Sequence, residues 1–204
     1  MPRSKPYHHG HLREALLQAA IELIAEVGPA GFTLREVARR AGVSHNAPYR
    51  HFPEQRYLLA AVAAQGFREL NQAMLDGAKR QRDSVGRLKR AGLAYVEFAL
   101  DRPEHFTVMF DAPPASKEDD PCDAGAAEQA FGTLVGFVKH CQDEGRLSAG
   151  DTYQLALLAW SMVHGVAKLA TAKRLPFESK TDILKFARFV IEQSLPVRSK
   201  RSEP

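Results

Sequence analysis

The 204-residue sequence predicts an all-α protein of about nine helices, on three observations. Apolar residues recur every three or four positions along most of the chain, which is the spacing of a helix face. No run alternates strictly between apolar and polar residues, so we expect no sheet. Clusters of glycine, proline and aspartate separate the periodic runs, as at residues 28–31 and 111–123, and these read as loops.

The composition places the chain among ordinary globular proteins. Hydrophobic residues make up 45% and charged residues 25% of the sequence. The net charge of +4 suits a polyanionic partner. No segment approaches the roughly 18 apolar residues of a membrane span, and the first residues lack the apolar core of a secretory signal. We therefore expect a cytoplasmic protein that does not contact the membrane.

The residue types exclude several kinds of chemistry. Cys122 and Cys141 have no metal-ligand spacing, so we interpret both as reduced thiols. The histidines at 8, 9 and 11 lack accompanying cysteines or carboxylates. The chain has no nucleophile elbow and no glycine-rich phosphate loop. We expect no enzymatic activity, no cofactor and no metal.

Residues 33–52, TLREVARRAGVSHNAPYRHF, predict two short helices separated by a glycine turn. Thr33 and Glu36 have the spacing of a capping box, which opens a helix by satisfying two free N–H groups. Gly42 follows the last periodic residue, where a left-handed residue ends a helix. Ser44 is then a second N-cap, for a helix over residues 45–52. This order is a helix-turn-helix.

The exposed side of the second helix offers polar side chains at His45, Asn46, Arg50 and His51. Asn, Arg and Ser read base edges, whereas Tyr and basic groups hold phosphates. The alternative is a plain helical hairpin with a polar outer face. The basic residues before Gly10 can lie along phosphates or enter a minor groove, or form a disordered tail.

The pattern Phe32-Thr33, Val37-Ala38, Ala41-Gly42-Val43-Ser44, Tyr49 and His51-Phe52, followed by Leu58-Leu59, resembles the DNA-binding domain of TetR-family transcriptional regulators. The sequence departs from the family at Pro48, where Leu or Ile is usual, and at Gln55, where Lys is frequent. The resemblance implies binding to double-stranded DNA. We expect the contacts from Thr33, Arg35, Ser44, His45, Asn46, Ala47, Tyr49, Arg50, His51 and Arg56.

The remaining helices follow from periodicity and from their caps. The first is expected over residues 11–27, and a long one over 54–80 links the DNA-binding domain, residues 10–70, to a second domain, 71–197. Further helices are expected over 84–101, 103–110, 124–144, 151–173 and 181–194. Asp151 caps the sixth of these seven helices, and Pro196 begins a basic tail.

The last two long helices carry more apolar residues than one buried face requires. They can pair with their twofold copies as a four-helix bundle, or they can both be core. Dimerisation through these helices is what the TetR resemblance implies. The expected interface residues are Leu155, Leu158, Met162, Ile183, Phe186 and Val190.

Trp160 and His164-Gly165 resemble a Trp/His-Gly signature found in one type of TetR C-terminal domain. Trp160 and His164 are four residues apart and share a helix face. The resemblance implies a mostly apolar ligand pocket; the alternative is a core tryptophan beside a hydrogen-bonded histidine. The expected lining residues are Tyr95, Phe98, Phe106, Met109, Phe110, Trp160 and His164.

Together these features predict a ligand-responsive regulator, a repressor that binds a palindromic operator as a homodimer and is released by a small, largely apolar effector. Two other classes stay open. One is a DNA-binding regulator or activator that takes no ligand. The other is a helical scaffold that has lost DNA binding.

Overall fold

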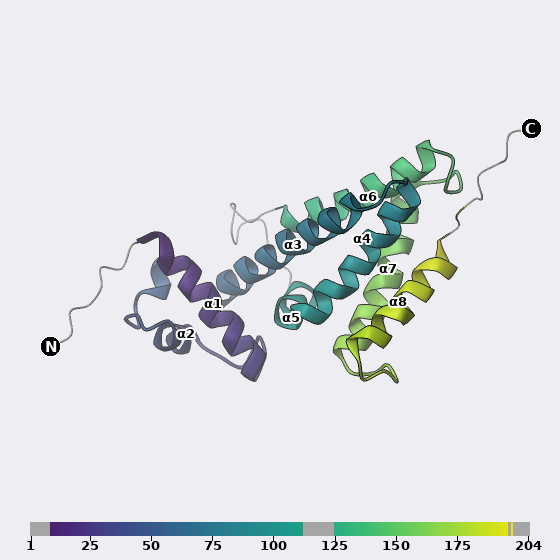
Figure 1. Cartoon of the computed structure of the whole chain (residues 1–204). Helices are drawn as coiled ribbons and strands as arrows, with labels where there is room; N and C mark the ends of the chain where they lie inside the picture. The colour runs from purple at the N-terminus through teal and green to yellow at the C-terminus, as the bar shows by residue number, and fades with distance from the viewer. Residues whose placement is uncertain (1–8, 112–124, 196, 198–204) are drawn as a thin grey trace, which may run out of the picture. The chain divides into compact units, whose positions relative to one another are not determined.

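The computed structural model describes residues 9–111, 125–195 and 197, and it confirms the all-α prediction. Within these residues there are eight α-helices, one short 3-10 helix and no strand; Leu147 and Val197 form a single isolated bridge (Figure 1). None of the described helices is long and apolar enough to cross a membrane. The helices are α1 (His9–Val27), α2 (Leu34–Arg40), η1 (Pro48–Arg50), α3 (Gln55–Lys79), α4 (Ser84–Asp101), α5 (Pro103–Asp111), α6 (Ala126–Asp143), α7 (Thr152–Thr171) and α8 (Lys180–Ser194).

The chain divides into two compact units, and α5 falls with the first. The first unit holds the chain up to Gly66 together with the segment that begins at Glu104. The second holds Phe67–Pro103 and the chain from Gly125 onward. This division differs from a single boundary at residue 70, because Val108 of α5 is buried in the core of the first unit.

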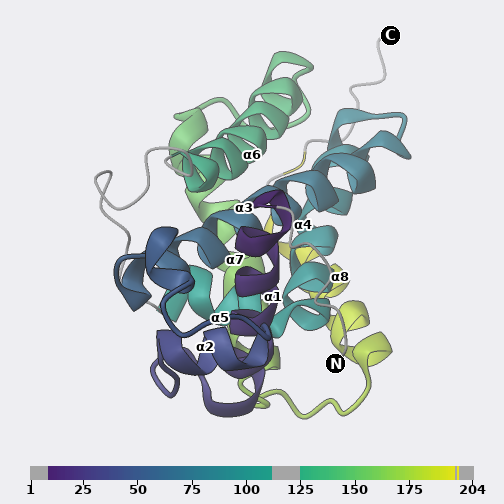
Figure 2. The same ribbon diagram turned by 90° about the vertical axis from the view of Figure 1, so that its left-hand side faces the viewer.

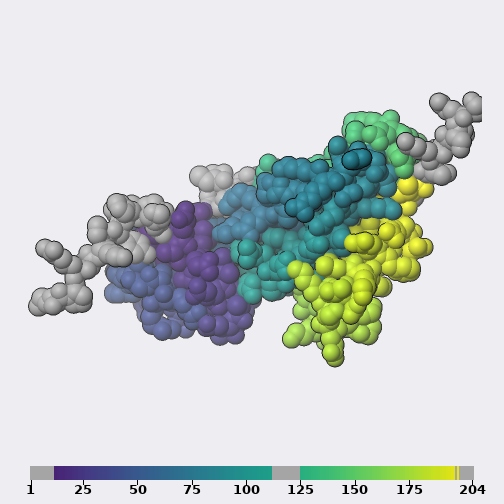
Figure 3. Space-filling view, in the orientation of Figure 1, coloured from purple at the N-terminus to yellow at the C-terminus, as the bar shows by residue number. Residues whose placement is uncertain are grey.

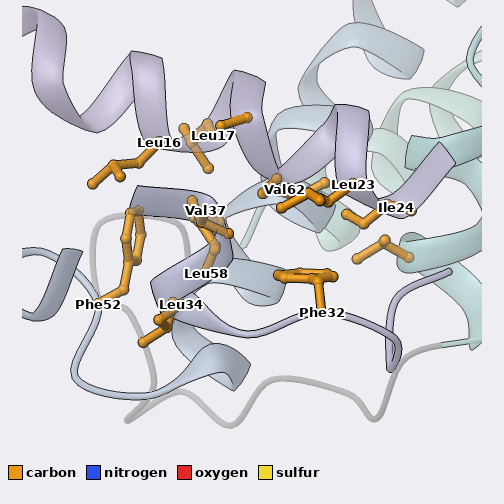
Figure 4. Close-up of a cluster of buried hydrophobic side chains, with 14 of the residues drawn as sticks. Leu16, Leu17, Leu23, Ile24, Phe32, Leu34, Val37, Phe52, Leu58 and Val62 are labelled. Carbon is orange, nitrogen blue, oxygen red and sulfur yellow. The ribbon is translucent and has the colours of Figure 1, made fainter. Parts of the chain in front are cut away.

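The core of the first unit is built by α1, which buries one face along its length. Leu16, Leu23 and Ile24 of α1 pack with Val37 of α2 and with Leu58 and Val62 of α3 (Figure 4). Phe32 and Phe52 belong to the same cluster and lie on either side of Val37 in Figure 4. Burial of these side chains stabilises the unit by roughly 1.5–3 kcal/mol each.

Three helices of the second unit begin at side-chain caps; the sequence predicts the one at Asp151, whereas those at Asp83 and Ser179 are findings of the structure. The Asp83 carboxylate accepts a hydrogen bond from the N–H of Gly86 at the start of α4. The Asp151 carboxylate accepts from Tyr153 and Gln154 at the start of α7, and the Ser179 hydroxyl from Asp182 at the start of α8. Each side chain satisfies donors that a helix N-terminus leaves open.

Helix α4 is the centre of the second unit and packs against α6, α7 and α8 (Figures 1 and 2). Gly92 permits the close approach of α7 and α8. A Cβ built at Gly92 lies 3.3 Å from both Val163 and Ile191. Leu88, one turn before Gly92 on the same face, packs with Val138 of α6 and Ala156 of α7. Cys141 is a free thiol buried in this core, and burial raises its pKa. Cys122 lies outside the described residues.

Candidate functional site

The turn after α2 has the expected geometry. Gly42 has a φ of +69°, the left-handed conformation that glycine adopts most readily. The N–H of Val43 donates to the carbonyl of Ala38 at 3.0 Å, and the N–H of Gly42 donates to that of Arg39 at 3.2 Å. These two bonds form the C-terminal motif that closes a helix with a glycine. The Thr33–Glu36 capping box at the start of α2 is present as well.

The predicted helix over residues 45–52 is wrong in its extent. Only Pro48–Arg50 is helical, as the 3-10 helix η1, and residues 45–47 form a turn and a bend. A helix that opened at Ser44 would need an N–H at position 48 to bond the Ser44 carbonyl. Pro48 has none. The Ser44 carbonyl instead accepts from Ala47 at 2.9 Å, which gives a tight turn in place of a helical one.

This segment is fixed to the core by two side chains. Pro48 and Phe52 are almost completely buried, four residues apart. Arg13 of α1 lies over the Phe52 ring at 5.6 Å. Because the anchors point inward, the residues around them point outward. Ala47 is half-buried, whereas the other predicted contacts of the segment are exposed, namely Ser44, His45, Asn46, Tyr49, Arg50 and His51.

The cations of this surface differ in their availability. Arg40 pairs with both carboxylate oxygens of Glu26 at 2.7 Å, and this contact lowers the pKa of Glu26. By contrast, the structure gives Arg35 and Arg50 no ion pair within the described residues. Arg39 is also exposed and lies four residues from Arg35 on α2, so it shares that face. Arg39 was not among the predicted contacts, although the spacing indicated it.

Three other positions are engaged inside the first unit. The Thr33 hydroxyl donates to Glu36 at 2.9 Å within the capping box. The Gln55 amide donates to the carbonyl of Pro29 at 2.9 Å, so this glutamine holds the loop between α1 and α2. Arg56 is exposed, lies over the Tyr57 ring and bonds Glu54 at 3.3 Å. The basic arm before residue 9 lies outside the described residues.

In the second unit, three of the predicted ligand residues meet. The Trp160 indole N–H donates to the Tyr95 hydroxyl at 3.2 Å, and that hydroxyl lies 2.8 Å from His164 Nδ1. The Tyr95 hydroxyl donates to His164 Nδ1 when that nitrogen is unprotonated and accepts from it when it is protonated, so the direction of this bond follows the histidine tautomer. Burial raises the pKa of Tyr95, which keeps the hydroxyl protonated.

The other four predicted ligand residues lie elsewhere. Phe98 lines a charged hollow between α3 and α4. Phe106, Met109 and Phe110 belong to the first unit, where the rings of Phe106 and Phe110 are 5.0 Å apart. Tyr95 itself borders a small apolar cavity of about 30 Å³ between α3, α4, α6, α7 and α8. The seven residues therefore do not surround one cavity within either unit.

The predicted interface residues have mixed exposure. Leu158 is 46% exposed, Leu155, Met162, Phe186 and Val190 are half-buried, and Ile183 is buried in the protomer. Ile183 shares the inward stripe of α8 with Ala187 and Ile191, at the four-residue spacing of a helix face. Tyr153, Leu169 and Phe189, which were not predicted, are exposed on the same two helices.

An exposed polar segment after a glycine turn, carried by a small helical unit and followed by a larger helical unit, defines a helix-turn-helix DNA-binding protein. Two family matches agree with this. Residues 16–62 match the family of bacterial regulatory proteins, tetR family, and residues 88–193 match the family described as Tetracyclin repressor-like, C-terminal domain. The chain belongs to the TetR family of transcriptional regulators and is not an enzyme.

Individual relatives are similar over part or all of the chain. An HTH-type transcriptional repressor of Mycobacterium tuberculosis is 40% identical over 60 residues, 29% of this chain and 32% of that one. Tetracycline repressor protein class C of Escherichia coli is 47% identical over 51 residues, 25% of this chain and 23% of that one. The matched segment thus spans a third or less of these relatives.

Solved structures match over nearly the full length. A protein of unknown function from Rhodococcus sp. RHA1 is 32% identical with a TM-score of 0.79, over 95% of this chain and 100% of that one. A tetR-family regulatory protein from Rhodococcus RHA1 is 20% identical with a TM-score of 0.69, over 90% and 96%. The second likeness is one of fold.

Proposed function

We propose that the chain is a cytoplasmic homodimeric repressor that binds a palindromic operator and is released by a small, largely apolar effector. The observation that carries the DNA-binding part is the outward segment held by Pro48 and Phe52. His45, Asn46 and Arg50 are exposed there and form no side-chain hydrogen bond within the described residues. Base edges in a major groove offer the donors and acceptors that such side chains need.

The second unit supports the dimer. Leu158 is 46% exposed on α7 and Phe189 is 58% exposed on α8. These two helices pack against each other, so their outward apolar residues form a surface that a second copy can cover. A twofold dimer presents two reading segments to two half-sites, which lie about 34 Å or a multiple apart.

The polar pair beside the small apolar cavity supports the effector. Tyr95 lines the cavity and is hydrogen-bonded to His164, and Leu88, Leu134 and Val163 are among the apolar walls. A cavity of about 30 Å³ has room for little more than a water molecule, so an effector must enlarge it. An effector that binds the enlarged state more tightly shifts the protein away from the DNA-binding state.

The test combines protection mapping with affinity measurements. Nuclease protection of the DNA upstream of the chain's own coding region should reveal a site with twofold symmetry. Affinity for that site should fall with salt, and Tyr49→Ala should reduce the slope of log K against log salt by about 1. Salt-insensitive binding that is equal in wild type and Tyr49→Ala rules out the proposed surface. Lys139→Ala on α6 is the control.

The small cavity also favours a second candidate, a regulator that takes no ligand in the second unit. Trp160 is the only tryptophan, and it touches both Tyr95 and His164. An effector that releases DNA should therefore change the fluorescence emission of Trp160 over the same range of effector concentration in which it lowers operator affinity. If candidate effectors change neither the emission nor operator affinity, the ligand-independent regulator is the better description.

A further inference from the structure

The turn between α3 and α4 carries a dense set of basic residues. Residues 79–90, KRQRDSVGRLKR, contain six cations and one acid. The acid, Asp83, is occupied as the N-cap of α4, where it accepts from Gly86 at 2.9 Å. This basic segment belongs to the second unit. It is therefore separate from the exposed segment after α2 that we propose contacts DNA.

Part of this segment lines a hollow of about 220 Å³ with α8. Leu93 and Ile191, both buried, form apolar parts of its wall. The surfaces of α3, α4 and α8 adjoin in the blue, teal and yellow regions of Figure 3. Three cations line the hollow against one carboxylate: Lys89, Arg90 and Arg188 against Glu192.

Two of the three cations that line this hollow have no partner among the described residues, and the third is paired through one side of its guanidinium. Across the part of the chain that the structure describes, Lys89 and Arg188 form neither an ion pair nor a side-chain hydrogen bond. The Arg90 guanidinium donates through Nη2 to Glu97 at 2.8 Å, which fixes its orientation. Its Nη1 is buried without a hydrogen-bond partner, and an unsatisfied buried donor is costly.

A second hollow provides a comparison, because the acidic side chains that line it form ion pairs. It measures about 510 Å³ and lies between α3 and α4. The four acids among its described lining residues are paired with cations: Glu97 with Arg90 at 2.8 Å, Glu69 with Arg102 at 3.5 Å, Asp76 with Lys79 at 2.7 Å, and Asp101 with Lys180. The excess of positive charge is therefore concentrated in the smaller hollow.

We propose that the smaller hollow binds a compact oxyanion with two or more negative charges, a phosphate or a polycarboxylate. Arginine forks match the geometry of both groups, and a lysine adds a mobile point charge. The volume is below the roughly 300–1,000 Å³ of sites for drug-sized ligands, so a small anion, or the anionic end of a larger one, fits. The site does not depend on the apolar cavity at Tyr95.

The test uses the full chain with pyrophosphate and with citrate, each against sodium chloride of equal ionic strength. Titration calorimetry should give saturable binding, and Tm should rise by about 3–5 °C at ten times the dissociation constant. Binding of pyrophosphate alone identifies a phosphate site, and binding of citrate as well identifies a general polyanion site. A rise in Tm that chloride reproduces would overturn the proposal.

Two variants locate the site. Lys89→Gln/Arg188→Gln should weaken binding at least about tenfold, as expected for the loss of two charge-assisted hydrogen bonds. Lys139→Gln/Arg174→Gln also removes one lysine and one arginine, outside the hollow, and should bind like wild type. Equal binding by all three proteins would refute the assignment.

A gain of affinity tests the site even if the double variant folds poorly. Glu192→Gln removes the one carboxylate among the described residues that line the hollow, so binding should tighten severalfold. Unchanged or weaker binding would contradict the proposal. Lys89→Gln/Arg188→Gln should also keep the operator affinity and salt slope of wild type; a lower slope would mean that these cations contact DNA instead.

Discussion

Asn46 offers both a donor and an acceptor from a turn that holds it away from the core. We expect Asn46→Ala to cost roughly 1–3 kcal/mol of operator affinity, because a bidentate contact to one adenine is lost. The loss should disappear when that one base pair of the operator is changed. Fluorescence anisotropy with a set of single-substituted operators measures it. Equal weakening on every sequence would make Asn46 a phosphate contact.

The carboxyl group of Asp83 makes the stability of the protein depend on pH in the acid range. Its hydrogen bond from the Gly86 N–H lowers the pKa of the carboxyl below the ordinary value. A group with a lowered folded pKa stabilises the protein above its unfolded pKa of about 3.9 and loses that effect as the pH falls through the folded value.

Asp83→Asn keeps a good N-cap but removes the titration. We expect the variant to lose less stability than wild type between about pH 5 and pH 3. Urea midpoints at the two pH values measure the difference, with Lys139→Gln as a surface control. Parallel losses in variant and wild type would show that Asp83 contributes nothing to the acid transition.

At the scale of elements, most helices follow from local signals. The sequence predicts the bounds of α4 from its apolar periodicity. It predicts the starts of α2 and α7 from Thr33 and Asp151, because caps satisfy donors locally. Pro48 is the exception. The polar pattern favoured a helix over residues 45–52, and a single missing N–H reduced it to η1.

A substitution at Gly42 tests whether the left-handed glycine is what ends α2. We expect Gly42→Ala to destabilise the first unit by roughly 1–2 kcal/mol, because its φ of +69° places a Cβ against the backbone. Gly132→Ala is the matched control, since Gly132 lies inside α6 with nothing within 4 Å of a built Cβ. Urea unfolding should show the control gaining roughly 0.5–1 kcal/mol. Equal effects would contradict the turn geometry.

At the scale of the whole molecule, no local signal in the sequence indicates which of the two units α5 joins. Residues 103–110 are predicted as a short helix, and nothing near Pro103 distinguishes packing on α1 from packing on α7. The residues that α5 packs against lie far away in sequence: Val108 is buried in the same cluster as the apolar residues of α1. For the same reason the predicted ligand residues were grouped by type and were not divided between the two units.

The proposed dimer also belongs to this scale. We expect Leu158→Glu to dissociate it at micromolar concentration, because a charge would be buried in an apolar interface. Sedimentation should show monomer, and operator affinity should fall with it. Gln129→Glu makes the same charge change on the exposed face of α6 and should stay dimeric. A Leu158→Glu protein that remains dimeric would place the interface elsewhere.

The membership of α5 in the first unit has a practical consequence for anyone dissecting or recombining this protein. The polypeptide passes between its two folding units three times, so no single cut separates them. A fragment ending after α3 would lack Val108 and leave a gap in its own interior. A chimaera that joins the first unit to the second unit of another protein must therefore include α5 as well as the amino-terminal segment.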